Sequence, residues 1–191
     1  MTRWIACVVV VLTFGAAWGQ KRDPAHGAAK AAPCAACHGS PSAAPLPGMP
    51  LLAGQQGEFL VLQMFLMREG LRNVPEMKGL LNGWTDADLE NVGAFFAAQP
   101  PPAGGAKRDP KLHARGAAIS QGMGCGSCHL QKYVGQRQVP RLANQREDYL
   151  ASSMKAYRDN KRSGADTNMN GIMYKVSDSD IQALAHYFAH Q

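Results

Sequence analysis

The pentapeptide Cys-x-x-Cys-His occurs twice in this chain, and it limits the fold more than any other feature of the sequence. The first copy, "CAACH", begins at Cys34, and the second, "CGSCH", begins at Cys125, an offset of 91 residues. Residues i and i+3 lie on one side of a helical turn, so each copy presents two thiols together, followed directly by an imidazole. This spacing is the attachment signature of c-type haem, which forms thioethers with both thiols while the histidine binds the iron. The residues expected to hold two covalent haem c groups in this way are Cys34, Cys37, His38, Cys125, Cys128 and His129.

Three other uses of paired cysteines fit the sequence less well. An even number of cysteines in an exported chain suggests disulfides, but here a histidine directly follows each pair. A zinc site would need further ligands in each half, and although His26 and His113 correspond, neither half has a second cysteine pair. A thioredoxin-like redox pair belongs in a βαβ context, which this sequence does not predict.

The regions around the two motifs also repeat each other. "PLLAGQ" at residues 50–55 matches "PRLANQ" at residues 140–145, an offset of 90, and "TDADL" matches "SDSDI" at an offset of 92. Matches at nearly one offset indicate two copies of one domain. Between them lies a segment with three prolines and two glycines, typical of a linker. The predicted boundaries are domain 1 at 20–99, linker at 100–108 and domain 2 at 109–191.

The periodicity of both copies is helical. Thr85 and Ser177 are favourable N-cap residues, and apolar residues at i, i+3 and i+7 follow each of them. A middle helix is predicted near 58–69, and its counterpart near 147–160. We expect His186 and His190 on the surface of the last helix. The predicted fold class is all-α, with two tandem small domains, each folded around a covalently bound haem that enlarges its core.

The sixth ligand of each iron should come from matching positions in the repeat. Met77 lies eight residues before Thr85, and Met169 lies eight residues before Ser177. A methionine thioether in this position closes the iron site and raises the reduction potential. We therefore predict Met77 and Met169 as iron ligands, whereas Met173 has no methionine counterpart in the first half and is expected in the core.

A pair of histidines is the alternative to the two methionines. His26 and His113 occupy matching positions in the two copies. Both precede the haem motif on the same helix or its lead-in, from which the opposite face of the haem is hard to reach. The methionine pair is therefore preferred.

Residues 1–19 resemble a secretory signal peptide. One basic residue precedes an apolar run at 4–14, and Ala17 and Gly19 occupy the −3 and −1 positions before a cut at Gln20. The run is short for a membrane span, although a retained N-terminal anchor is the alternative. Export to the periplasm fits the haem motifs, because c-type haem is attached outside the cytoplasm.

Charge is distributed unevenly along the chain. Residues 20–99 carry 6 basic and 7 acidic side chains, a net charge of −1, whereas residues 109–191 carry 11 and 7, a net charge of +4. The basic residues are scattered, without the long runs typical of nucleic-acid binding, so no nucleic acid is expected. Docking of the second domain on an acidic protein partner is the favoured hypothesis.

These motifs together resemble the dihaem cytochrome c4 family. The resemblance rests on the two CxxCH motifs, on "PLLAGQ" followed by "EFLVLQM" and "REGLR", on the loop methionine and on "TDADLENVGAFFA". It implies two class I cytochrome c domains, with Pro50 and Pro140 at the position whose carbonyl orients the ligand histidine. The second half departs from the family pattern, because Leu130 replaces the glycine after the motif and "LANQ" replaces "LAGQ".

The resemblance implies a periplasmic electron carrier rather than an enzyme. Its donor would be a quinol-oxidising complex or a dehydrogenase, its acceptor a terminal haem-copper oxidase, and peripheral membrane association stays open. A dihaem subunit of a sulfide- or alcohol-oxidising dehydrogenase is the alternative. A dihaem peroxidase fits less well, since it needs an open iron and is generally larger.

Overall fold

The described part of the chain is all-helical, as predicted. A computed structural model describes residues 22–40, 43–104, 107–162 and 168–191, and no strand is found among them. None of their helices has the length and apolar character that a bilayer crossing requires. The predicted signal peptide at 1–19 lies outside the described residues.

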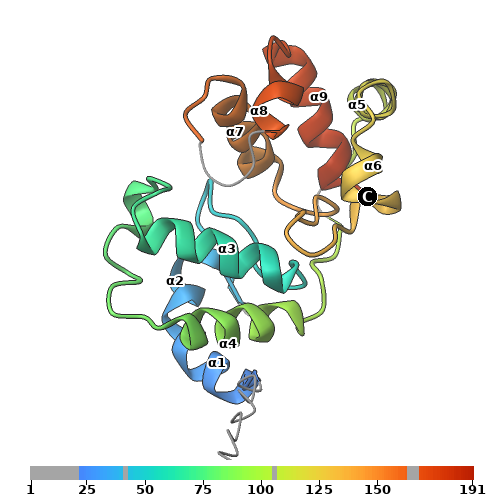
Figure 1. Ribbon diagram of the computed structural model, residues 1–191. Helices are drawn as coiled ribbons and strands as arrows, with labels where there is room; N and C mark the ends of the chain where they lie inside the picture. The colour runs from blue at the N-terminus through green and yellow to red at the C-terminus, as the bar shows by residue number, and fades with distance from the viewer. Residues whose placement is uncertain (1–21, 41–42, 105–106, 163–167) are drawn as a thin grey trace, which may run out of the picture.

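The first half of the chain forms one group of helices, in the lower part of Figure 1. Its α-helices are α1 (Pro24–Ala31), α2 (Ala35–His38), α3 (Gly57–Arg68) and α4 (Asp86–Ala97). Two short 3-10 helices, η1 (Ala32–Cys34) and η2 (Pro75–Met77), lie between them. Both α1 and α3 pack against α4. The predicted middle helix is therefore confirmed, one residue earlier at each end.

The second half forms a second group that repeats the first. Its helices are α5 (Pro110–Gly122), α6 (Gly126–His129), η3 (Gln131–Tyr133), α7 (Glu147–Arg158), α8 (Asn168–Met173) and α9 (Asp178–Ala189). Both α5 and α7 pack against α9, so α5, α7 and α9 correspond to α1, α3 and α4 (Figure 1). The predicted arrangement of two similar helical domains in tandem is confirmed, while the residue boundaries given above remain a prediction.

The two matched helices α4 and α9 begin at the predicted N-caps. The Thr85 hydroxyl accepts a hydrogen bond from the Asp88 N–H, and the Asp88 carboxylate accepts one from the Thr85 N–H in return. The Ser177 hydroxyl accepts from the Asp180 N–H in the same way. Each cap satisfies a backbone donor that would otherwise lack a partner, and this fixes where the helix starts.

Glycines allow the closest helix crossings in both groups. A Cβ atom at Gly116 of α5 would collide with the backbone carbonyl of Ala183 and the Cβ of Tyr187 on α9. At the matching position, a Cβ atom at Gly27 of α1 would collide with the carbonyl of Asn91 on α4. Each crossing brings the first helix of a group against its last, next to the haem motif.

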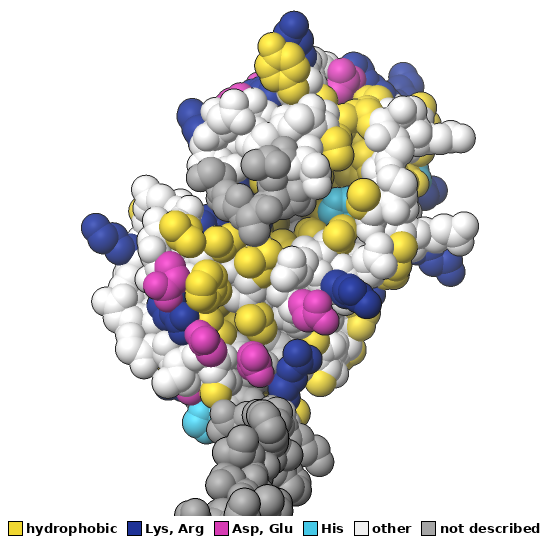
Figure 2. All heavy atoms as spheres, in the orientation of Figure 1, with side chains coloured by type: hydrophobic (Ala, Val, Ile, Leu, Met, Phe, Trp, Pro, Cys, Tyr) yellow, Lys and Arg dark blue, Asp and Glu magenta, His cyan; other side chains and the backbone are white. Residues whose placement is uncertain are grey.

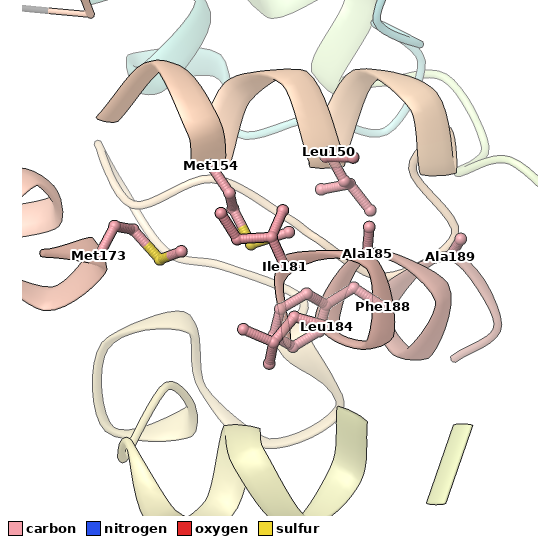
Figure 3. Packing of buried hydrophobic residues seen from close by; sticks show 9 residues of the cluster. Leu150, Met154, Met173, Ile181, Leu184, Ala185, Phe188 and Ala189 are labelled. Carbon is pink, nitrogen blue, oxygen red and sulfur yellow. The ribbon is translucent and has the colours of Figure 1, made fainter. Parts of the chain in front are cut away.

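Each group has its own hydrophobic core. The first consists of Ala31, Phe59, Leu60, Val92 and Phe96. The second is larger, and Figure 3 shows its residues on α7, α8 and α9, where Met173 points toward Met154 and Ile181. Met173 is only 2% exposed, which confirms its predicted place in the core.

The expectation that His186 lies on the surface is wrong, since its side chain is buried. Its Nε2 accepts a hydrogen bond from the Asp109 N–H at 2.9 Å, and its Nδ1 donates to a carboxylate oxygen of Glu147, also at 2.9 Å. The imidazole therefore joins the starts of α5 and α7 to α9. Two partners far away in the sequence account for its burial.

Candidate functional site

The two CxxCH motifs form short helices at equivalent places in the two groups. The second cysteine and the histidine of each motif lie on α2 or α6, and the first cysteine directly precedes the helix. None of the four motif cysteines forms a disulfide; Cys34 and Cys125 are half-buried, and Cys37 and Cys128 are exposed. Burial raises the pKa of the Cys34 and Cys125 thiols. Both motifs thus keep two unlinked thiols on one turn, as thioether formation requires.

Each motif histidine is held by a prolyl carbonyl. His38 Nδ1 lies 2.9 Å from the Pro50 oxygen, and His129 Nδ1 lies 2.8 Å from the Pro140 oxygen. A carbonyl can only accept, so the proton is on Nδ1 and the lone pair is on Nε2, the tautomer suited to a metal. Burial lowers the pKa of His38, although the bond to Pro50 opposes this shift, which favours the neutral imidazole.

A single cavity of about 720 Å³ extends between the two groups of helices. Most of the predicted haem residues line it, namely Cys34, His38, Met77, Cys125, Cys128, His129 and Met169. Cys37 is not on its wall. The structure therefore brings residues from both copies of the motif to one continuous, mainly apolar space, which suits two large flat macrocycles.

The two predicted methionines occupy matching places on this wall. Met77 ends η2, and Met169 lies in the first turn of α8. Other methionines also line the cavity: Met49, Met64 and Met67 in the first half, and Met123, Met154 and Met173 in the second. Position on the wall alone therefore does not select the ligand, and the match within the repeat remains the argument for Met77 and Met169.

The alternative histidine ligands have other partners. His26 Nε2 lies 3.1 Å from a carboxylate oxygen of Asp88, and the His113 ring packs edge-on against the Tyr187 ring, with centroids 4.9 Å apart. Neither histidine lies on the wall of the cavity. Both instead connect the first and last helices of their group, a structural role.

Two arginines at matching positions give the cavity a positively charged wall. Arg162 is 9% exposed, and Arg72 is partly buried; no carboxylate in the described part of the chain pairs with either one. Burial and the neighbouring charge of Arg162 lower the pKa of Arg72. Burial alone would raise the pKa of Tyr149, but Arg162 and Arg72 outweigh it and bring the value to about 8. Both guanidinium groups donate to the neutral amide oxygen of Gln63, which does not balance their charge. One buried and one partly buried positive charge side by side favour an anionic partner, and the propionate carboxylates of a haem fit this need.

The sequence motifs did not assign Arg72 and Arg162 a place at the site. The usable signal was their shared offset of 90, the same offset that links "PLLAGQ" to "PRLANQ". A polar residue repeated at the offset of the motif residues is a candidate for contact with the same group.

The surface where the two groups meet is apolar on the face drawn in Figure 2. Hydrophobic side chains gather along this junction, while acidic side chains lie over the N-terminal group below it. Exposed large hydrophobic residues near the predicted ligands include Leu46, Leu80 and Ile172. An apolar area beside a redox centre is suited to brief contact with a partner protein.

Comparison with known proteins gives consistent results. Residues 113–191 match the family model described as cytochrome c. The chain is 40% identical to cytochrome c4 of Pseudomonas aeruginosa, over 86% of this chain and 87% of that protein. The crystal structure of reduced recombinant cytochrome c4 from Pseudomonas stutzeri superposes with a TM-score of 0.79 and 34% identity, covering 88% of this chain and 98% of that one. The thiosulfate dehydrogenase electron acceptor of Stutzerimonas stutzeri strain A1501 is 31% identical over 97% of this chain and 91% of that protein.

A cytochrome c fold built twice, with two covalently bound haem c groups, defines a dihaem c-type cytochrome, which is an electron-transfer protein and not an enzyme. The similarity extends over both copies of the motif and most of the length of the relatives. The chain belongs to the cytochrome c4 family.

Proposed function

We propose that this protein is a periplasmic electron carrier that delivers electrons toward a terminal haem-copper oxidase. The proposed attachment residues are Cys34 and Cys37 for the first haem and Cys125 and Cys128 for the second. The proposed iron ligands are His38 with Met77 and His129 with Met169. One observation carries the assignment: each motif histidine bonds to a prolyl carbonyl, and a repeat-matched methionine shares its cavity.

The residues of the chain have separable roles in this proposal. Each bound haem supplies an iron that cycles between the ferrous and ferric states. Pro50 and Pro140 hold the imidazoles in the ligating tautomer, and the two methionines close the irons to small molecules and favour the reduced state. Arg72 and Arg162 neutralise the propionates and lower the cost of burying them.

Methionine substitutions test the ligand assignment. Met169→Ala should convert the second haem from a low-spin to a partly high-spin centre, because the iron loses a ligand. Met173→Ala is the matched control from the same helix; it removes a core residue and should lower stability while leaving the low-spin optical and magnetic spectra unchanged. The opposite result would place the ligand at Met173.

Export and the acceptor are tested on the protein from its native cell. We expect the periplasmic fraction to contain a chain that begins at Gln20 and oxidises rapidly when membranes with a haem-copper oxidase are added. A chain that keeps residues 1–19 and sediments with membranes would instead support the anchored form.

The uneven charge supports docking of the second domain on an acidic partner surface. Residues 109–191 carry the net charge of +4. Electron-transfer rates with the physiological partner should fall as ionic strength rises, since salt screens charges beyond about 10 Å at 0.1 M. A rate that is independent of salt would refute charge-guided docking.

The second candidate function is that of an electron acceptor dedicated to one dehydrogenase. The similarity to an electron acceptor of thiosulfate dehydrogenase favours it. Purification of the chain in a stable complex with such an enzyme, with thiosulfate-dependent reduction of both haems, would favour this function over a mobile carrier.

A further inference from the structure

Two buried glutamines join the two groups of helices in a symmetric way. The side-chain amide of Gln145 pairs with both backbone groups of Leu51: Leu51 N–H donates to Gln145 Oε1 at 2.8 Å, and Gln145 Nε2 donates to the Leu51 carbonyl at 2.9 Å. Gln55 pairs with Arg141 in the same way, at 2.7 and 3.0 Å. Gln55 and Gln145 are 90 residues apart, and so are Leu51 and Arg141. We call these four residues the glutamine clasp.

The side-chain oxygen of each glutamine in the clasp accepts two hydrogen bonds, which uses both of its lone pairs. Gln55 Oε1 also accepts from the Gln56 N–H, and Gln145 Oε1 also accepts from the Arg146 N–H, both at 2.9 Å. The two glutamines are 6% and 5% exposed. Buried amides whose oxygen and Nε2 both bond to backbone fix geometry strongly, because each lost bond would leave an unsatisfied backbone group.

The backbone that each glutamine holds belongs to the support of the other half's histidine. Leu51 directly follows Pro50, whose carbonyl accepts from His38. Arg141 directly follows Pro140, whose carbonyl accepts from His129. The connection therefore crosses over: Gln145 of the second half steadies the peptide that orients His38, and Gln55 of the first half steadies the peptide that orients His129.

We infer that Gln55 and Gln145 are positioning residues for the haem of the opposite half, and that the clasp couples the two redox centres through their histidine supports. Each glutamine acts through the peptide that carries a prolyl carbonyl, since its side-chain hydrogen bonds go to backbone groups and not to a predicted iron ligand. The consequence is a reciprocal dependence, in which the ligand field of either iron is set partly by the other domain. This inference rests on the proposed ligation by His38 and His129.

The test uses the complete holoprotein with one glutamine changed at a time. Gln145→Met and Gln55→Met keep the side-chain volume but remove the crossing hydrogen bonds. Gln121→Met, at an exposed position of α5, is the control. Proton NMR of the oxidised protein reports the hyperfine-shifted methyl signals of each haem. Those signals are assigned to their half through contacts with Phe96 or Phe188, which line the cavity from matching positions.

Each substitution is expected to shift the NMR signals of the haem in the opposite half of the chain. Gln145→Met should shift the signals of the first haem more than those of the second, and Gln55→Met should do the reverse, while Gln121→Met shifts neither. A variant that loses only the haem of the opposite half supports the same conclusion. Shifts or losses confined to the variant's own half, or equal in both halves, would overturn the inference. Failure of the ligand assignment is recognised separately, because the unmodified protein would then lack the signals of two iron-bound histidines.

Discussion

Replacing Gly116 by alanine should destabilise the second domain markedly. A Cβ atom there would lie 2.5 Å from the Cβ of Tyr187 and closer still to the carbonyl oxygen of Ala183. Ordinary contacts are about 3.5–4.0 Å, so α5 and α9 would have to separate by about 1 Å. The obstacle is helix backbone and cannot rotate away.

The loss in free energy of unfolding caused by Gly116→Ala is the sum of two opposing effects. Overpacking costs about 1–3 kcal/mol, and the upper end applies because backbone blocks the methyl group. The higher helix propensity of alanine stabilises the helix by about 1 kcal/mol relative to glycine. The net loss is then about 2 kcal/mol, or roughly 10 °C in Tm for a domain of this size.

Thermal unfolding of the holoprotein, followed by circular dichroism, measures the effect. Gly122→Ala is a matched control in the same helix, because nothing lies within 4 Å of a Cβ atom at Gly122. It should stabilise the domain by about 0.5–1 kcal/mol. A Gly116→Ala protein as stable as Gly122→Ala would refute the argument that this glycine sets the helix crossing.

Two further predictions concern strain and charge. Leu130 has a φ of +64°, close to that of its counterpart Gly39 at +79°. A positive φ strains a leucine but not a glycine, so Leu130→Gly should stabilise the second domain by about 1 kcal/mol. Guanidinium unfolding measures the change, and a loss of stability would contradict backbone strain at Leu130. Hydrogen bonds from the Thr85 backbone and from His26 hold the pKa of Asp88 far below its usual range. A lowered carboxyl pKa stabilises the fold above the unfolded-state pKa of about 4 and ceases to do so as pH falls toward the lowered value. Asp88→Asn should thus cost about 1 kcal/mol at pH 7, and its difference from the unmodified protein should shrink below pH 4; a difference independent of pH would exclude the linkage.

Local features of the site could be predicted from the sequence because they depend on near neighbours. The CxxCH spacing depends on a single helical turn, and the caps at Thr85 and Ser177 depend on three residues each. The bonds from His38 to Pro50 and from His129 to Pro140 span only 12 and 11 residues, and family resemblance predicted them.

Contacts between the halves could not be predicted in this way. The clasp bonds of Gln55 and Gln145 join residues 86 and 94 positions apart. A repeat shows that two units exist but carries no information on how they face each other. Likewise, the burial of His186 depends on Asp109 and Glu147, which only the folded chain brings to α9. A polar residue repeated at the motif offset was the one available signal for the interface.

A redox titration of the purified protein, followed by optical and magnetic spectra, tests the number of haems and their iron ligands together. We predict two haem c groups per chain, each taking up one electron and each low-spin with histidine and methionine as iron ligands. One haem per chain, or a five-coordinate high-spin iron in the active protein, would contradict it, and the high-spin result would favour the peroxidase alternative.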